Sequence, residues 1–332
     1  MELNSLKRFI AAAEAGSLGK AAEALSISQP GLSKSIRQLE LDFGGKLLDR
    51  NAKGVTLTAF GKTVYVRAKR ILAEWRHLDN ERVALFNGLV GHITVGIARG
   101  TGFLGRVIPA VSARLSNERY AVHLTVVSGV AGELTQALRL GDLDFAVAVL
   151  EGVKTDADLV QEVLFYDRCG LFADARHPLA GRATSGIRDL AAFCWLCSSD
   201  AEPLREALVG LAHGTGVAPR KTLIDSNSVV YLISTLIGSD FVGLLPMDAV
   251  EDAIDDGRLV ELVLDPEQRS QVAAAAVERP VGFLRRADSA LSPVALAFQD
   301  EIRSHCLKLG YPLVSVNTPR VAPLVLTQIA DR

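Results

Sequence analysis

The sequence predicts an all-α N-terminal domain, one long helix and a larger α/β region. Apolar residues recur at helical spacing near the N-terminus, whereas short apolar stretches alternate with helical patterns after residue 91. The charge changes at the same place, because residues 1–90 hold 14 basic and 9 acidic residues and residues 91–332 hold 22 and 29. A length of 332 residues suits about two domains. A basic domain joined to an acidic one is typical of a nucleic-acid-binding module attached to a separate unit.

The N-terminal region has the pattern of three short helices. Apolar residues share one face of a helix over 3–15, a second helix is expected over 20–25, and Ser28 is a good N-cap for the third. Pro30 is tolerated in the first turn of that helix. Three short helices with a tight turn before the third form the helix-turn-helix pattern, although an ordinary helical subdomain can have the same spacing. Gly54 indicates a β-hairpin after it, as in a winged domain.

The polar face of the third helix and the expected wing supply candidate DNA contacts. Gln29 can pair with an adenine edge, and Lys34 or Arg37 can donate to guanine or to phosphate. Cations on the wing would contact phosphates and set affinity more than sequence choice. The complete candidate set is Ser28, Gln29, Pro30, Ser33, Lys34, Arg37, Arg50 and Lys53.

A long helix is expected over residues 59–90, which contain no proline. Its apolar residues recur every seven positions, with further ones between them, and form the start of a heptad seam. The members of this stripe are Val64, Ala68, Ile71, Trp75, Leu78 and Leu85. An isolated helix with such a stripe needs a partner, so a homodimer contact is predicted; packing on the same subunit is the alternative.

From Gly91 onward the chain alternates between strand and helix patterns, which predicts βαβ units and a parallel sheet covered on both faces. Strands are expected at 92–98, 122–127, 145–149, 170–172, 193–197, 222–224, 241–245 and 272–277. Helices are expected up to Leu115 and over 133–140, 226–237 and 292–309. The segment 310–332 contains three prolines and is predicted to be an irregular tail.

Several classes of protein are disfavoured by the sequence. No stretch reaches the roughly 18 apolar residues of a membrane span, so a cytoplasmic protein without a membrane partner is expected. Cys194 and Cys197 have CxxC spacing but lie in an expected buried strand, which favours core packing over a metal or redox site. No hydrolase or dinucleotide-binding motif is found. We therefore expect no catalysis, no metal and no cofactor.

A pattern of about sixty residues closely resembles the N-terminal signature of LysR-type transcriptional regulators. It comprises Phe9, Ala12, Ala13, Gly16, Ser17, Leu18, Ala21, Ala22, Leu25, Ser28, Gln29, Pro30, Leu32, Ser33, Ile36, Leu39, Glu40, Gly44, Leu47, Leu48, Arg50, Leu57, Thr58 and Gly61. Later runs are also similar to that family, namely Leu140–Asp144, His177–Gly181, Asp225–Ser226 and Gly243–Pro246. Gly19 and Lys34 depart from the family's commoner residues at their positions.

The resemblance implies a winged helix-turn-helix, a dimerising linker helix and an effector domain like a type 2 periplasmic binding protein, with two α/β lobes. The implied boundaries are 1–58, 59–90 and 91–309, with lobe one at 91–165 and 267–309, lobe two at 166–266 and a tail at 310–332. The resemblance also implies sequence-specific binding of double-stranded DNA, a small-molecule effector between the lobes, and a homodimer or homotetramer. A cytoplasmic solute-binding protein without a DNA role is the alternative, against which the basic N-terminal domain weighs.

By family position, the effector would contact Thr101, Gly102, Ser128, Gly129, Val130, Ser226 and Asn227. Thr101 would lie at the N-terminus of the first helix after the first strand, where free N–H groups favour a carboxylate or another anion. A plain N-cap is the alternative for Thr101. Ser226 and Asn227 would begin a helix of the opposite lobe. The segment Ser128–Ala131 has few polar groups, so an acidic effector is possible but not required.

Overall fold

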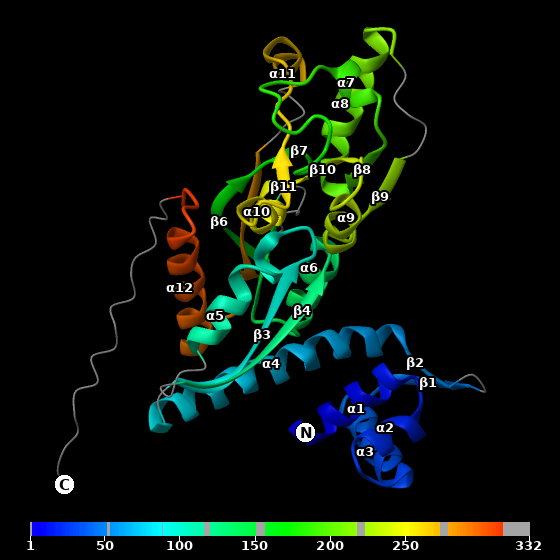
Figure 1. The fold of residues 1–332 in the computed structure, drawn as a ribbon. Helices are drawn as coiled ribbons and strands as arrows, with labels where there is room; N and C mark the ends of the chain where they lie inside the picture. Colours follow the sequence, from blue (N-terminus) through cyan, green and yellow to red (C-terminus); the bar gives the residue numbers. More distant parts are fainter. Residues whose placement is uncertain are drawn as a thin grey trace, which may run out of the picture.

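The computed structural model describes residues 2–51, 54–87, 89–115, 120–150, 157–217, 223–272 and 278–314. Figure 1 shows an N-terminal helical domain below a long helix, one α/β lobe above that helix, and a second lobe farthest from the N-terminal domain. Within the described residues, no helix combines the length and the apolar character needed to cross a membrane.

The N-terminal domain is a three-helix unit with a β-hairpin, as predicted, although the hairpin begins at Leu48 and not after Gly54. Its elements are α1 (Leu3–Ala15), α2 (Leu18–Ala24), α3 (Gln29–Asp42), β1 (Leu48–Asn51) and β2 (Gly54–Leu57). Helix α2 begins two residues earlier than expected, because the Ser17 hydroxyl accepts a hydrogen bond from the Lys20 N–H at 3.4 Å and caps it. Phe9, Leu32 and Ile36 are fully buried between the helices.

Helix α4 (Ala59–Asn87) connects this domain to the rest of the chain. Its 29 residues span about 43 Å at a rise of 1.5 Å per residue. The Thr58 hydroxyl accepts a hydrogen bond from the Gly61 N–H at 2.8 Å, which fixes where the helix begins. In Figure 1 the helix passes from the N-terminal domain beneath lobe one.

Lobe one is built on a five-stranded sheet with the strand order β4-β3-β5-β12-β6. Its strands are β3 (Leu89–Ala98), β4 (Tyr120–Gly129), β5 (Phe145–Val149), β6 (Leu159–Asp167) and β12 (Arg279–Arg286). Its helices are η1 (Gly102–Leu104), α5 (Val107–Leu115), α6 (Ala131–Leu140) and α12 (Pro293–Lys308). Strand β3 is parallel to β4 and β5, whereas β12 is antiparallel to β5 and β6.

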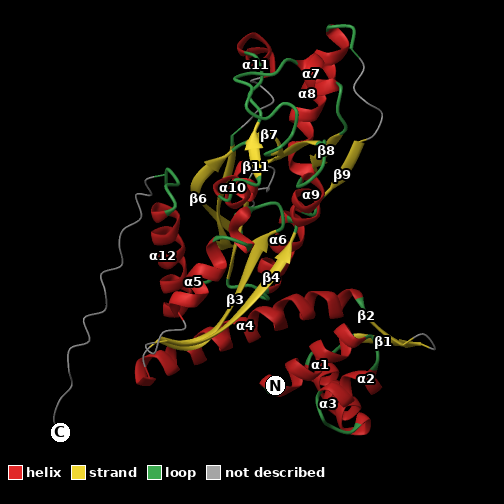
Figure 2. Ribbon diagram, in the orientation of Figure 1, coloured by secondary structure: helices red, strands yellow, loops and turns green. Residues whose placement is uncertain are grey.

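Lobe two has a second five-stranded sheet with the order β11-β7-β10-β8-β9. Its strands are β7 (Cys169–Asp174), β8 (Trp195–Ser198), β9 (Leu223–Ser226), β10 (Val242–Pro246) and β11 (Leu259–Glu261). Its helices are α7 (Ile187–Ala191), η2 (Ser199–Ala201), α8 (Glu202–Gly214), α9 (Val229–Leu236), α10 (Met247–Asp255) and α11 (Pro266–Val272). Figure 2 shows helices around the sheet of each lobe, and separate apolar clusters cover the two faces of each sheet.

The chain passes between the lobes twice, so the expected two-lobe α/β architecture is present. Strand β6 leads through Arg168 into β7, and β12 returns to lobe one after α11. The return makes β12 antiparallel to β5 and β6, and in lobe two β7 is antiparallel to β10 and β11. Both sheets are therefore mixed, whereas a parallel sheet was predicted.

One further prediction needs correction. The strand expected at 272–277 is wrong at its start, since Val272 ends α11, residues 273–277 lie outside the described residues, and the strand is β12. The first residues of the segment expected to be an irregular tail pack on lobe one: the Tyr311 ring centroid lies 4.3 Å from that of Phe165, and the Val314 N–H donates to the Leu164 carbonyl at 2.8 Å. Residues 315–332 lie outside the described part of the chain.

Candidate DNA-binding and effector-binding sites

Helix α3 presents an uncovered polar face at its N-terminal end. The Ser28 hydroxyl accepts a hydrogen bond from the Gly31 N–H at 3.2 Å, so this side chain caps the helix as predicted. Burial of the opposite face against α1 and α2 fixes the rotation of α3 about its axis. The side chains of Gln29, Pro30, Lys34 and Arg37 are consequently exposed.

The wing is attached to α3 by side-chain contacts. Arg50 of β1 donates to the Ser33 hydroxyl at 3.0 Å, so these two predicted DNA-contact residues bond to each other. Lys53 lies outside the described residues. Sequence reasoning assigned no role to Glu40, whose carboxylate accepts hydrogen bonds from the Leu47 and Leu48 N–H groups at 2.9 and 3.2 Å. Glu40 thereby fixes the start of the wing relative to the end of α3.

The apolar stripe of α4 divides into a covered part and an exposed part. The prediction is wrong for Val64 and Ala68, which are 8% and 1% exposed because they pack into the core of the N-terminal domain of the same chain. Ile71, Trp75 and Leu78 are 44%, 52% and 56% exposed. The side chain of Leu85 lies outside the described part of the structure.

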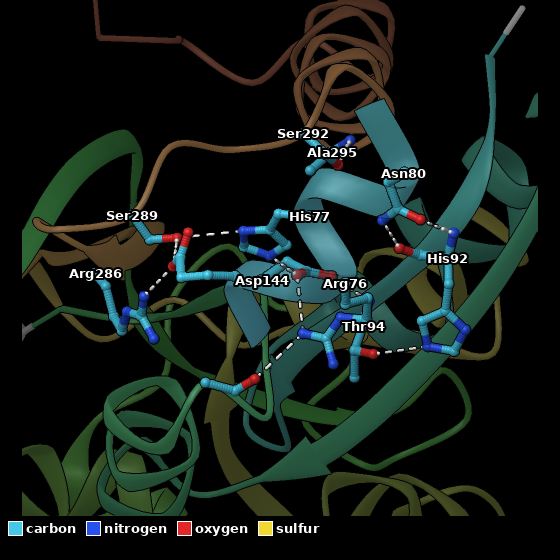
Figure 3. Close-up of polar contacts among 12 residues, drawn as sticks. Arg76, His77, Asn80, His92, Thr94, Asp144, Arg286, Ser289, Ser292 and Ala295 are labelled. Atoms are coloured by element: carbon cyan, nitrogen blue, oxygen red, sulfur yellow. Dashed lines mark hydrogen bonds and ion pairs between the residues drawn. The ribbon is translucent and has the colours of Figure 1, made fainter. Parts of the chain in front are cut away.

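A second face of α4 makes a polar contact with lobe one that the sequence did not reveal (Figure 3). The Asp144 carboxylate lies 2.7 Å from His77 Nε2 and 3.2 Å from Arg76 Nη2, and it accepts the Thr94 N–H at 2.6 Å. Burial alone would raise the pKa of Asp144, but the contact with His77, the charge of Arg76 and the Thr94 N–H together hold it below its usual value. We call this contact the α4–lobe one joint.

Further bonds extend this joint along α4. The Asn80 amide donates to the His92 carbonyl at 2.7 Å and accepts the His92 N–H at 3.0 Å, which ties α4 to β3. Arg286 of β12 donates to Glu74 at 2.6 Å. These pairs are 12 or more residues apart in the chain, so no local sequence pattern indicates them.

In lobe one, the parallel pairing of β3 and β4 places the ends of the two strands side by side, with Ala98 opposite Gly129. The Arg99 N–H donates to the Gly129 carbonyl at 3.1 Å just after β3 ends. Ser128 and Val130 are exposed at the end of β4. The Val130 N–H is already bonded to Glu133 at 3.0 Å, and Glu133 also pairs with Arg99 at 3.1 Å.

The structure places no α-helix start at Thr101, contrary to the prediction. Its side chain is buried, with 5% exposure, and its hydroxyl donates to the Ala98 carbonyl at 3.0 Å. A three-residue 3-10 turn follows it, and α5 begins only at Val107, so no α-helix starts at this residue. The Gly102 N–H is also engaged, because it donates to Asp248 of lobe two at 2.8 Å.

In lobe two, the predicted helix start needs a small correction. Ser226 is the last residue of β9, and its hydroxyl accepts the Ser228 N–H at 3.0 Å. Ser228 caps α9 by accepting the Tyr231 N–H at 3.4 Å. Ser226 and Asn227 therefore precede the helix, with Asn227 exposed between the strand and the cap.

Cys197 is buried in β8 and fits core packing better than metal binding, whereas Cys194 precedes that strand and is only partly buried. The ligand atoms of Cys197, Glu202 and Asp225 lie within 4.8 Å of one another. Burial raises the pKa of the Cys197 thiol to about 12, which disfavours the thiolate that a metal needs. Arg205 donates to Glu202 at 2.7 Å and already neutralises that carboxylate.

Two family profiles match this chain. The profile described as "Bacterial regulatory helix-turn-helix protein, lysR family" matches residues 3–62, and the profile "LysR substrate binding domain" matches residues 86–307.

Curated relatives extend over most of the chain. It is 31% identical over 300 residues to the SDS degradation transcriptional activation protein of Pseudomonas sp. (strain ATCC 19151), which covers 90% of this chain and 94% of that protein. It is 30% identical over 231 residues to the HTH-type transcriptional regulator CysL of Bacillus subtilis (strain 168), which covers 69% and 76%.

Solved structures share the fold of most of the chain. A full-length OxyR variant from Pseudomonas aeruginosa has a TM-score of 0.65 at 21% identity, covering 96% of this chain and 99% of that one. Full-length CbnR in complex with its target DNA has a TM-score of 0.58 at 21% identity, covering 92% and 100%. With both profiles matched, the chain belongs to the LysR family of transcriptional regulators, with a DNA-binding helix-turn-helix domain and an effector-binding domain.

Proposed function

We propose that this regulator reads its operator through the exposed face of α3. The observation that carries this proposal is the capped N-terminus of α3, where Gln29, Lys34 and Arg37 are exposed while the opposite face is buried. A helix presented in this way can enter the major groove, with the wing beside the phosphates. Arg50 then serves mainly to hold Ser33 and the wing in place. A regulator with this role binds chromosomal DNA, so we propose that the protein is located in the cytoplasm.

We also propose that Ile71, Trp75 and Leu78 form the contact between two copies of α4. They are three large apolar side chains at i, i+4 and i+7 on one helical face, each at least 44% exposed. Contiguous exposed apolar surface of this kind commonly marks a protein–protein contact. A homodimer is the smallest assembly that covers it, and two dimers would form a homotetramer.

For the effector, we propose a small molecule bound between the lobes, against the exposed residues Ser128, Val130 and Asn227. Residues 1–58, 59–90 and 91–309 would then be the DNA-binding, linker and effector-binding units. The Gly102 N–H lies where free N–H groups were expected to favour an anionic effector, but it is bonded to Asp248. We therefore propose no charge for the effector.

A selection from random double-stranded DNA with the full-length protein tests this function. We expect enrichment of a two-fold symmetric motif, retention of that motif in a gel-shift assay, and loss of retention for Lys34→Ala combined with Arg37→Ala. Recovery of no motif, together with equal retention of all sequences, would contradict the proposal and favour a solute-binding protein without a DNA role.

A further inference from the structure

The two lobes meet where η1 of lobe one lies against the start of α10 of lobe two. The Gly102 N–H donates to Asp248 Oδ2 at 2.8 Å, and Asp248 is only 3% exposed. A Cβ atom added at Gly102 would overlap the carbonyl oxygen of Asp248, so only glycine permits this approach. The contact is therefore a close-packed joint between the backbones of the two lobes.

Charged residues support this joint from its rim. Arg106, which follows η1, contacts Glu251 and lies 3.2 Å from Asp252 and 3.3 Å from Asp255, all on α10. The Tyr311 hydroxyl of lobe one also donates to Glu251, at 3.1 Å. Helix α10 is thus attached to lobe one along its length, with Asp248 at the buried end.

The contact between η1 and α10 lies next to both segments through which the chain passes from one lobe to the other. The Asp248 N–H donates to Asp167 Oδ1 at 3.1 Å, and Asp167 forms a buried ion pair with Arg279. Asp167 ends β6 and Arg279 begins β12, the strands through which the chain leaves and re-enters lobe one. The side chain of Asp248 therefore lies where a change in the angle between the lobes must move it.

The carboxyl group of Asp248 accepts a hydrogen bond from a backbone N–H group, as a bound ligand would, and is not held mainly by an ion pair. One carboxyl oxygen accepts from Gly102, and the carboxyl group also interacts with that of Asp167. Burial and the negative charge of Asp167 raise the pKa of Asp248 well above its usual value. The neutral acid is the form that this environment favours.

We propose that the Asp248 carboxyl group acts as a built-in ligand. It extends from lobe two, occupies the hydrogen-bonding position at the Gly102 N–H of lobe one, and so holds the lobes together without an effector. Removal of this side chain leaves a buried donor and a space that takes a small carboxylic acid or its amide. The regulatory consequence rests on the proposed function, since an effector that parts the lobes must break the Asp248 contact.

The test compares full-length wild type with Asp248→Ala, using formate as the probe. Hydrogen–deuterium exchange of the segment 99–106 and the midpoint of thermal unfolding are measured in sodium formate and in sodium chloride of equal ionic strength, at pH 5.5 and 7.5. In Asp248→Ala we expect exchange at Gly102 to rise at least tenfold. Formate should slow that exchange again and raise the unfolding midpoint, more strongly at pH 5.5, and wild type should show neither response.

Asp252→Ala is the matched control, because Asp252 lies one turn further along α10 and its side chain pairs with Arg106 at the rim. We expect this variant to retain protection at Gly102 and to ignore formate. Equal exchange at Gly102 in wild type and Asp248→Ala, or a formate effect no larger than that of chloride, would overturn the proposal.

If Asp248→Ala fails to fold, Asp248→Asn and Asp248→Ser decide the matter. Asparagine keeps an oxygen at the acceptor position and should preserve protection at Gly102, whereas serine is one bond shorter and should lose it. Equal protection in both variants would refute the built-in ligand. None of these measurements uses DNA or an effector, so failure of the proposed function and failure of this inference are distinguishable.

Discussion

At the residue scale, Gln29 is exposed directly after the Ser28 cap and can form two hydrogen bonds with one base edge. We expect Gln29→Ala to relax base preference at one position of each half-site, at a cost of about 1–3 kcal/mol for the preferred base. Competition binding against single-base variants of the selected operator measures this.

Gln38→Ala is the matched control for that experiment. Gln38 is also exposed on α3, but it lies near the C-terminal end and donates to Asp42 at 3.0 Å. Its removal should leave base preference unchanged. A Gln29→Ala variant with wild-type affinity and wild-type sequence preference would show that α3 is docked differently.

The raised pKa of Asp248 predicts a pH dependence of stability with an unusual sign for a carboxyl group. The folded protein holds the proton more tightly than the unfolded chain, so stability falls as pH rises from about 4, the unfolded value, toward the raised folded value. Asparagine cannot lose this proton. The unfolding free energy from urea titrations should therefore fall less steeply with rising pH in Asp248→Asn, and parallel profiles would contradict the assignment.

At the element scale, α4 makes three different contacts with two faces. The apolar stripe packs into the N-terminal domain through Val64 and Ala68 and, further along the helix, exposes Ile71, Trp75 and Leu78, while a second face forms the α4–lobe one joint. Each contact occupies a different part of the helix surface. A change in one contact can therefore be tested with the other two intact.

For the exposed face, we expect Ile71→Asp to disfavour the dimer, because the contact would bury a charge without a partner. Sedimentation velocity should show a smaller species, and DNA affinity should fall because linked DNA-binding domains benefit from effective concentration. Leu307→Asp is the control, since Leu307 is 60% exposed on α12, away from this face. An Ile71→Asp variant that retains the wild-type sedimentation coefficient would rule out this stripe as the interface.

For the α4–lobe one joint, we expect Asp144→Asn to lower the unfolding free energy by about 1–3 kcal/mol, because Arg76 and His77 would lose a buried charged partner. Asp142→Asn is the control: Asp142 lies two residues away, and its ion pair with Lys69 is partly exposed, with a value of about 0–1 kcal/mol. Chemical denaturation compares the two variants. Equal losses of unfolding free energy in the two variants would show that the burial of Asp144 adds no stability beyond that of a partly exposed ion pair.

The sequence predicted best those elements whose stability is decided locally. Helix α3 combines a Ser28 cap with a regular apolar face, and both signals lie within a few residues of each other. Strand β6 and helix α8 were not predicted, and the β12 strand was placed too early. The site predictions failed where distant residues decide the outcome: Asp248 engages the N–H group at Gly102 from 146 residues away, and the N-terminal domain buries Val64.

At the scale of the whole molecule, the contacts of lobe one and lobe two with the rest of the chain differ in kind. Lobe one is bonded to α4 through Asp144, Asn80 and Arg286, so α4 and lobe one should move as one body. The contacts of lobe two described above are with lobe one, through α10 and the two crossings. Rotation of lobe two is then the motion that an effector can drive without breaking the α4–lobe one joint.

Distances between spin labels test this division in the full-length protein. One pair of labels, at Glu81→Cys in α4 and Gln136→Cys in α6, measures the distance between α4 and lobe one. A second pair, at Glu81→Cys and at Glu206→Cys in α8, measures the distance between α4 and lobe two. All three positions are exposed. Cys194, the one native cysteine that is not fully buried, is replaced by serine. Dilution with unlabelled protein removes distances between subunits.

In an Asp248→Ala background we expect the distance distribution between α4 and lobe two to broaden, because the buried contact at Gly102 is lost while the crossings remain. The distribution between α4 and lobe one should not change, since the bonds of Asp144 are intact. Broadening of both distributions would mean that lobe one is not fixed to α4. Broadening of neither would mean that the rim contacts of Arg106 are sufficient to hold the lobes, and that an effector would have to break those ion pairs to separate them.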